Sequence, residues 1–506
     1  MTANASVSSP IPGFMRRNEC CGREIFQSRL GMLSNAVARP RAVQQTTGSA
    51  RMDSPARTWR RSDLVAILAA LALIIIAAII GYQLNRRGIP IVLPRPPLLA
   101  FWHPHIGWGT PLAILSLLLG LRLQQLIVAL PWRRLLLAGW LLNLAWMCSL
   151  TLVDGLQRGW IDVLLDPNEY LHDLRRISDP LIFLSSFSHY IAFGPGVDGD
   201  LVWTTHVAGH PPLITLTFWL LARAGLGGGF WAGALCILVA SAVSVALPIT
   251  LRELGAEASA RRIVPFIALF PGAVWMAVSA DGLFAGVAVS GLALVSRGAM
   301  RGRILASLTG GLLLGIAVFL SYGLVLLGLV VLLVMLQTVR RRGLPSVVGP
   351  WVSATLGFVA VAAIHLAVGF NWFSGLAALR VRYYQGIASQ RPFSYFIYAN
   401  FAAWLVACSP LLAVGIVRSI TTLARGRAGP WTQDGIAALL ALYGVLAALI
   451  ANVSGLSKAE AERIWLSFGV IAYSGLALLP GRSARWALVG SATWALLVNH
   501  LLNTGW

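Results

Sequence analysis

The sequence predicts an all-α membrane protein, a polytopic bundle of about thirteen transmembrane helices. Of the 506 residues, 57% are hydrophobic and only 11% are charged, a balance far from that of a soluble domain. The second observation is a series of apolar runs that approach the roughly 20 residues needed to cross a bilayer. These runs centre on Ile74, Leu118, Leu142, Val239, Leu269, Val289, Leu312, Val330, Val359, Leu405, Leu442, Ile471 and Ala492.

The N-terminal segment 1–62 is rich in Ser, Pro, Ala and Arg without periodicity, which predicts a disordered basic tail. The apolar run 64–80 follows two arginines and predicts a first membrane helix that keeps this tail in the cytoplasm. We divide the remaining chain into N-terminal membrane helices (63–133), a core (134–340) with an outer loop at 154–228, and C-terminal membrane helices (341–506). The cysteines, Cys20 and Cys21 among them, predict no required disulfide.

The formal net charge of +21 indicates topology rather than a nucleic-acid partner. The basic residues lie in short loops between apolar runs, whereas a nucleic-acid-binding protein gathers them on one soluble face. No phosphate-binding loop or dinucleotide fingerprint is apparent either. We therefore expect a multi-pass protein of the cell membrane that contacts membrane lipid and no nucleic acid.

The segment from Asp154 to His210 is acidic and falls on the outer side of the membrane in this topology. If the apolar stretch 211–226 then crossed inward, about five later basic loops would lie outside, against the positive-inside rule. The stretch is also short for a span. We therefore predict an interfacial or re-entrant helix here, although the outer loop 83–108 is an exception to the rule because it also carries arginines.

The motif "AGHPP" at 208–212 precedes this predicted helix. Proline is favourable at a first helical position, so Pro211 is expected to start the helix and to leave His210 beside the positive end of its dipole. That position favours an anion such as a phosphate. The alternative is that the prolines only mark a helix start and that His206 and His210 are solvated.

A metal site is the other alternative for these histidines, with Asp198 or Asp200 as a further ligand. Two histidines four residues apart align on one face of a helix. Gly209 interrupts such a helix, and a proline follows the second histidine. We therefore expect no metal, and a divalent cation stays an alternative cofactor.

The outer segment resembles the GT-C class of integral-membrane glycosyltransferases. In that class a membrane helix ends in an acid, the first large outer loop carries an acidic Asp-Glu-x-x-Tyr motif, and the loop ends in Lys-Pro-Pro-Leu. Here "VDGLQRGWIDVLLDPNEYLHDL" and "HPPLITLTFWLL" are the similar stretches, with His210 in place of the lysine. "FPGAVWMAVSADGLFAGV" (270–287) is similar to a hairpin that returns an aspartate to the outer surface.

This resemblance covers residues 134–340 best and the remainder loosely. The whole chain is also similar to uncharacterised integral membrane proteins of high-GC bacteria that carry "GHPP" and "ERIW" together. The GT-C resemblance implies transfer of a sugar from a polyprenyl-phosphate donor to a glycan or lipid acceptor of the cell envelope, on the extracytoplasmic side. A transporter or flippase of a lipid or envelope precursor is the main alternative, and a non-catalytic envelope assembly partner is a third.

The resemblance implies a catalytic carboxylate in the outer loop. Asp154 is the first candidate base because it lies at the exit of a membrane helix, which can aim it, and because partial desolvation raises a carboxylate pKa. Its alternative is an Asp-Gly turn. Glu169 is the competing base because it fits the acidic family motif better. Asp166 is a helix cap or a substrate contact, and Tyr170 stacks on a sugar or packs the loop.

Asp281 interrupts an apolar stretch, where an acid is costly unless it faces water or a partner. It is a candidate to orient a substrate hydroxyl or, alternatively, a hairpin tip. In "LSKAEAERIW" (456–465), Ser457 and Glu460 match a capping box. Arg463 enters the membrane run, so we expect it to point into the bundle and to pair with an acid or to bind a phosphate.

The remaining candidates for substrate binding are Lys458 and Glu462 in the same segment and two arginines of the outer loop 378–392, Arg380 and Arg382. Arginine beside tyrosine suits sugar-phosphate recognition. Headgroup contact by an interfacial aromatic belt is the alternative for this loop.

Overall fold

The computed structural model describes residues 59–195, 197–426 and 429–504. All of these residues belong to one compact unit of the chain. The predicted tail at 1–62 lies outside the described residues except for 59–62, where the first helix has already begun at Arg61. Cys20 and Cys21 also lie outside the described residues.

The first part of the chain, up to the end of the outer segment, consists of three long helices and a series of short ones. The long helices are α1 (Arg61–Arg86), α2 (Gly109–Leu126) and α3 (Trp132–Thr151). The short elements are the π-helix η1 (Gln157–Ile161), the 3-10 helices η2 (Val163–Leu165), η3 (Tyr170–Arg176), η4 (Phe187–Tyr190) and η5 (Gly199–Leu201), and the α-helices α4 (Pro180–Ser186), α5 (Thr205–Gly209) and α6 (Leu213–Arg223).

The remainder is helical up to its last few residues. Its α-helices are α7 (Gly229–Ser241), α8 (Val243–Glu253), α9 (Glu257–Ala268), α10 (Ala273–Met276), α11 (Ala280–Arg301), α12 (Ile304–Leu320), α13 (Gly328–Arg342), α14 (Leu344–Ala367), α15 (Trp372–Gln385), α16 (Phe393–Cys408), α17 (Leu411–Ala424), α18 (Gln433–Val453), α19 (Ala461–Ile464), α20 (Leu466–Ala472) and α21 (Gly481–Leu501). Short 3-10 helices complete the set, η6 (Tyr322–Leu327), η7 (Ile387–Ser389) and η8 (Tyr473–Leu478).

One small sheet joins the segment between α1 and α2 to the last described residues. Strand β1 (Ala100–Trp102) pairs antiparallel with β2 (Leu502–Thr504), with Phe101 opposite Asn503. The pairing continues beyond β1, because the backbone N–H groups of His103 and His105 donate to the carbonyls of Leu501 and His500. The loop before α2 is thereby fastened to the end of α21.

The all-α bundle is confirmed, and so is its membrane character. Among the described residues, seven helical segments are long and apolar enough to cross a membrane, or eight if the bent pair α16 and α17 counts as one span. The pair is bent by 104° at a break of two residues, Ser409 and Pro410. Several other apolar runs are interrupted or short, so the predicted number of about thirteen spans stays a prediction.

At the break between α9 and α10, side chains of another helix donate hydrogen bonds to the backbone carbonyls. Asn143 donates to the carbonyls of Ile267 and Ala268, and the indole of Trp146 donates to the carbonyl of Phe270. Both donors come from α3 and are buried. An unpaired carbonyl in hydrocarbon costs several kcal/mol, so these side chains allow the chain to turn within the bundle before α11 begins.

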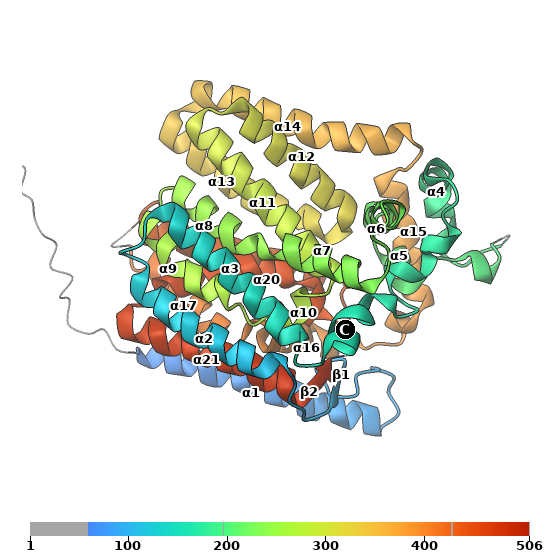
Figure 1. The fold of residues 1–506 in the computed structure, drawn as a ribbon, viewed down its shortest axis with the longest axis horizontal. Helices are drawn as coiled ribbons and strands as arrows, with labels where there is room; N and C mark the ends of the chain where they lie inside the picture. Colours follow the sequence, from blue (N-terminus) through green and yellow to red (C-terminus); the bar gives the residue numbers. More distant parts are fainter. Residues whose placement is uncertain (1–58, 196, 427–428, 505–506) are drawn as a thin grey trace, which may run out of the picture. The chain divides into compact units, whose positions relative to one another are not determined.

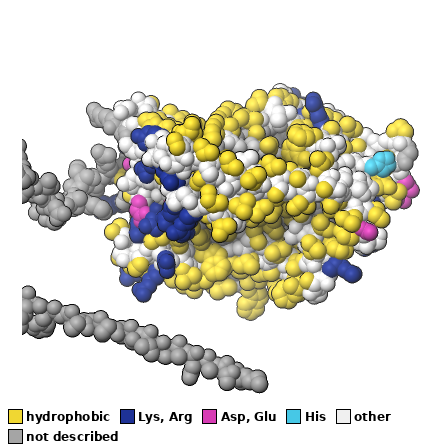
Figure 2. Space-filling model, turned by 90° about the horizontal axis from the view of Figure 1, so that it is seen from above, with side chains coloured by type: hydrophobic (Ala, Val, Ile, Leu, Met, Phe, Trp, Pro, Cys, Tyr) yellow, Lys and Arg dark blue, Asp and Glu magenta, His cyan; other side chains and the backbone are white. Residues whose placement is uncertain are grey.

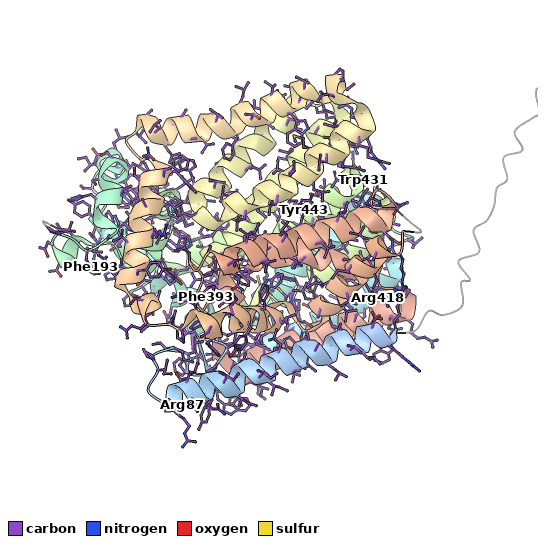
Figure 3. The ribbon with its side chains drawn as sticks, turned by 180° about the vertical axis from the view of Figure 1, so that it is seen from behind. Arg87, Phe193, Phe393, Arg418, Trp431 and Tyr443 are labelled. Carbon is purple, nitrogen blue, oxygen red and sulfur yellow. The ribbon has the colours of Figure 1, made fainter. Side chains whose placement is uncertain are left out.

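Charged loops gather at one end of the bundle. Arg301 at the end of α11 pairs with Glu253 at the end of α8 at 2.7 Å, and Arg262 of α9 pairs with Asp434 of α18 at 2.7 Å. Figure 2 shows dark blue side chains concentrated toward this end of the described chain, between broad apolar surfaces. Figure 3 places Arg418 toward the same end and Phe193 toward the other.

Helix α6 departs from the direction of the bundle, and its re-entrant or interfacial placement stays a prediction. Figure 1 shows α6 end-on, whereas α11, α12 and α14 lie across the view. The helix has 11 residues, too few for a span, and packs on η3 of the outer segment. Its first residue is Leu213, so the prediction that Pro211 starts it was wrong by two residues.

Candidate functional site

The outer segment 154–212 is held in shape by a buried acid that sequence reasoning missed. Asp173 is buried in η3, and its carboxylate accepts hydrogen bonds from the backbone N–H and the hydroxyl of Thr204 at 2.9 and 3.0 Å. Its other oxygen accepts from Arg176 at 3.1 Å, and this guanidinium stacks over the ring of Trp203. The clamp fixes the start of α5 against η3 and so brings together the segments that carry Glu169 and His206.

Arg463 forms the centre of the candidate site. Its Nη2 atom lies 3.0 Å from Glu169 Oε1, and its Nε donates to Asp281 Oδ2. All three side chains are buried, with residue exposures of 3% for Arg463, 3% for Glu169 and 6% for Asp281. They come from α19, from the residue before η3 and from the first turn of α11, so three distant segments meet in one ion-paired cluster.

His206 joins the cluster as a neutral imidazole. Its Nδ1 lies 2.8 Å from the carbonyl oxygen of Asn168 and therefore carries the proton, so that Nε2 accepts from Arg463 Nη1 at 3.3 Å. The same Nδ1 is 3.3 Å from Glu169 Oε1. Burial, with the nearby Arg463 guanidinium, lowers the pKa of His206 to about 3.

His210 and Tyr170 form the next layer. The Nδ1 atom of His210 lies 2.9 Å from the Tyr170 hydroxyl and 2.9 Å from the carbonyl oxygen of His206. Burial lowers the pKa of His210, so it too is neutral near pH 7. A neutral imidazole adds no positive charge that would attract a phosphate to this position. The residue follows α5 in an extended conformation and is not the cap of α6.

Asp281 is oriented by its own helix start. Ser279 caps α11, and its hydroxyl accepts from the backbone N–H of Asp281 at 3.1 Å. The same hydroxyl lies 3.3 Å from Asp281 Oδ2. Asp281 therefore occupies the first turn of a long helix rather than a free hairpin tip, and an acid is favourable there because of the helix dipole.

The cluster holds more negative than positive charge when both acids are ionised. Burial raises the pKa of Glu169, against the lowering effect of Arg463. One of its oxygens, Oε2, is buried without a hydrogen-bond partner in the described part of the chain. A carboxylate with one oxygen held and the other unpaired is equipped to take up a proton.

The segment that carries Arg463 is strained and tied from several sides. Ala459 and Glu460 both have left-handed φ angles, 83° and 62°, which non-glycine residues rarely adopt. Asn400 of α16 accepts from the backbone N–H of Ala459 at 3.2 Å and donates to the carbonyl of Ser457. Sequence reasoning missed Asn400, because an asparagine inside an apolar run gives no sign of the segment that it contacts.

The predicted capping box of this segment was wrong. Helix α19 begins only at Ala461, and Glu460 precedes it without a side-chain cap. The hydroxyl of Ser457 instead accepts from the indole of Trp465 at 3.1 Å. The helix therefore begins three residues later than a cap at Ser457 would place it, after two residues with positive φ angles, Ala459 and Glu460.

Two other candidates from the segment lie outside the cluster. The Nζ atom of Lys458 donates to the carbonyl of Ala388 at 2.8 Å and lies over the ring of Tyr384. Glu462 is fully buried, and neither of its carboxylate oxygens has a hydrogen-bond partner among residues 59–195, 197–426 and 429–504. Burial raises the pKa of Glu462 to about 7. Lys458 thus packs the loop, whereas Glu462 is a buried proton-binding group.

The outer loop arginines lie on or near α15, which packs against α5 and η4. Arg382 stacks over the ring of Phe193 at 4.1 Å, and Arg380 is exposed. Gln385 bonds both backbone groups of Phe193, at 3.0 and 2.7 Å. Asp166 is exposed and accepts from the backbone N–H of Asn168 at 2.8 Å, so it forms a local turn rather than a helix cap.

Asp154 belongs to a different group of side chains. It lies 3.2 Å from His105 Nε2 and 3.6 Å from Arg158 Nη2. Burial raises the pKa of Asp154 above its ordinary value. An open cavity of about 520 Å³, bordered by Asp154 and Trp108, lies beside it. The two candidate bases, Asp154 and Glu169, therefore have different partners and do not form one catalytic pair.

In the part of the chain that the structure describes, no group of three or more His, Cys, Asp or Glu side chains is arranged to hold a metal ion. Asp198 accepts from the backbone N–H of Asp200 at 3.1 Å in a local turn. His206 uses both ring nitrogens on protein partners.

No family model, no curated protein and no solved structure matches this chain. The chemistry of the site therefore has to be argued from its own residues. Six of the twelve predicted site residues meet in the buried cluster: Glu169, Tyr170, His206, His210, Asp281 and Arg463.

Proposed function

We propose that this chain is a membrane glycosyltransferase with a GT-C-like arrangement of about thirteen spans. In this proposal the enzyme transfers a sugar from a polyprenyl-phosphate donor to a glycan or lipid acceptor of the cell envelope, with Glu169 as the general base. The observation that carries the proposal is the buried cluster of Glu169, Arg463 and Asp281, in which Glu169 Oε2 has no partner within the described residues.

The distribution of charge supports an extracytoplasmic site in the cell membrane. The arginine-rich loops near Glu253, Arg301 and Asp434 gather at one end of the bundle, which the positive-inside rule assigns to the cytoplasm together with the N-terminus. The cluster and the outer segment lie toward the opposite ends of these helices, because Asp281 begins the helix that Arg301 ends. A lipid-linked donor then meets its acceptor at the outer membrane surface.

The proposed reaction is a displacement at the sugar carbon. The oxygen of an acceptor hydroxyl forms a bond to the anomeric carbon, and the bond from that carbon to the phosphate oxygen breaks, its electron pair leaving with the phosphate. The hydroxyl proton passes to Glu169 Oε2. Arg463 holds Oε1 and so orients the carboxylate, while Asp281 holds Arg463.

The donor phosphate needs a cation other than Arg463, whose guanidinium already serves two carboxylates and His206. Arg380 and Arg382 are the candidates, since α15 packs against the short helix α5 that carries His206. An exposed guanidinium such as that of Arg380 binds phosphate oxygens through two parallel N–H groups.

The test is transfer or hydrolysis of a panel of polyprenyl-phosphate sugars by the purified protein. Glu169→Gln keeps the size of the side chain and removes the proton acceptor, so we expect at least a roughly hundredfold loss of rate, the scale of general-base catalysis. Asp162→Asn is the matched control, because Asp162 is an exposed acid of the same outer segment. Equal rates for the Glu169 variant and the natural protein would refute the role of Glu169, and no turnover of any lipid-linked sugar would refute the function.

A further inference from the structure

The cavity beside Asp154 is built by close packing of the loop before α2 onto the end of α3. Gly107 and Gly109 allow this approach, because a Cβ atom on either residue would lie within about 2 Å of a backbone oxygen, that of Val153 or Ser149. Thr110 anchors the loop through a hydrogen bond of 2.8 Å to His500 Nε2 of α21. The walls of the cavity are thus held by three helices and by the β1 and β2 pairing visible in Figure 1.

The cavity has an apolar wall and a polar wall. Trp108 is 87% exposed, and Ile106, Pro111 and Val153 also border the cavity. The polar wall is the carboxylate of Asp154, with Arg158 at 3.6 Å. An exposed aromatic face beside hydrogen-bonding groups suits a ligand that has an apolar face and a polar edge.

The charges around Asp154 argue against an ionic ligand. Arg158 already balances the carboxylate, and His105 Nε2 lies 3.2 Å from Asp154 Oδ1 while its Nδ1 lies 2.7 Å from the carbonyl oxygen of His103. A cationic ligand would meet Arg158, and an anionic ligand would meet the carboxylate. A neutral polyhydroxylated ring avoids both costs, and its hydroxyl groups donate to Asp154 and accept from Arg158.

We propose that this cavity is a binding site for a neutral carbohydrate, whose ring stacks on Trp108 while its hydroxyl groups bond Asp154 and Arg158. Its contacts are separate from those of the Glu169 cluster, since the partners of Asp154 are His105 in the loop before α2 and Arg158 in η1. The proposal deepens the proposed function, because it assigns the acceptor a glycan portion that binds in this cavity. Only the identification of the bound carbohydrate with the acceptor rests on the proposed function. Binding of the sugar itself requires no transfer.

The experiment is saturation-transfer NMR on the full chain in lipid nanodiscs. The probes are the methyl glycosides of glucose, galactose, mannose and arabinose and neutral trisaccharides of the same sugars. We expect transfer to the ring C–H protons of at least one probe, and a loss of about tenfold in affinity for Trp108→Ala, the scale of one aromatic contact. Asp154→Asn is expected to weaken binding as well.

The control is Trp102→Ala, because Trp102 is also an exposed tryptophan but lies on β1. It is expected to bind the probes like the natural protein. No saturation transfer to any sugar, or equal affinity in the Trp108 variant, would overturn the proposal. Binding of ethanolamine in place of the sugars would overturn it too. Glu169→Gln separates the two proposals, since it is expected to bind sugars normally whatever its rate of transfer.

Discussion

Glu462 makes the stability of this protein depend on pH in a direction opposite to that of an ion-paired carboxylate. The side chain is fully buried without a hydrogen-bond partner in the described part of the chain, and burial raises its pKa from 4.5 to about 7. A raised carboxyl pKa means that the folded state favours the protonated form. Stability is therefore highest below about pH 4.5 as far as this group is concerned, and it falls as pH rises to about 7.

The magnitude follows from the difference in pKa. A shift from 4.5 to about 7 is about 2.5 units, which at 1.36 kcal/mol per unit gives about 3 kcal/mol. Glu462→Gln keeps the shape of the protonated side chain and cannot ionise. We expect the variant to match the natural protein near pH 4.5 and to exceed its unfolding free energy by about 3 kcal/mol at pH 8.

The assay is thermal unfolding of the detergent-solubilised protein, followed by intrinsic fluorescence between pH 4.5 and 8. The unfolding temperatures of the two proteins should separate as pH rises and stay parallel above about pH 7. Asp162→Asn, a change at an exposed acid, serves as the control and should follow the natural protein. The same pH dependence in Glu462→Gln and in the natural protein would show that Glu462 is ionised or solvated in the fold.

Two further predictions concern the cluster and the topology. Arg463→Ala leaves the carboxylates of Glu169 and Asp281 buried without their cation and should lower the unfolding free energy by roughly 3–5 kcal/mol. Adding Asp281→Asn should restore part of this loss in thermal unfolding. A double variant as unstable as the single one would contradict the pairing. A cysteine at Gly227 should react with an impermeant thiol reagent added outside intact cells, whereas one at Met300 should not. The reverse labelling pattern would contradict the proposed orientation.

Two residues of the buried cluster could be predicted from the sequence because charge in an apolar chain is costly. Asp281 and Arg463 interrupt apolar runs, and such residues need a partner or water. Their pairing was one of two alternatives for Arg463, and the structure supplies the acid. Glu169 and the histidines were found through motifs of the outer segment. No local sequence pattern determines where these motifs lie relative to the helices.

The errors have a common physical cause. The charge of His210 depends on how deeply the residue is covered, and the sequence around "AGHPP" contains no information on what covers it. Asp154 and Glu169 lie only 15 residues apart in the sequence, yet the π-helix and the 3-10 helix between them separate the two residues, which contact different neighbours. Asn400 and Asp173 were missed for the same reason, because each contacts a residue far along the chain. Asn400 accepts a hydrogen bond from Ala459, and Asp173 accepts one from Thr204.

The wide sequence separation within the cluster has a consequence for biosynthesis. Asp281 and Arg463 are 182 residues apart, and Glu169 precedes both. At about 5–20 residues per second, a ribosome needs about 10–40 s to travel from the aspartate to the arginine that pairs with it. Until then the growing protein holds two acids that have no cation to neutralise them. A chain released before Arg463 keeps both acids without this cation, and an unpaired buried charge strongly destabilises a fold.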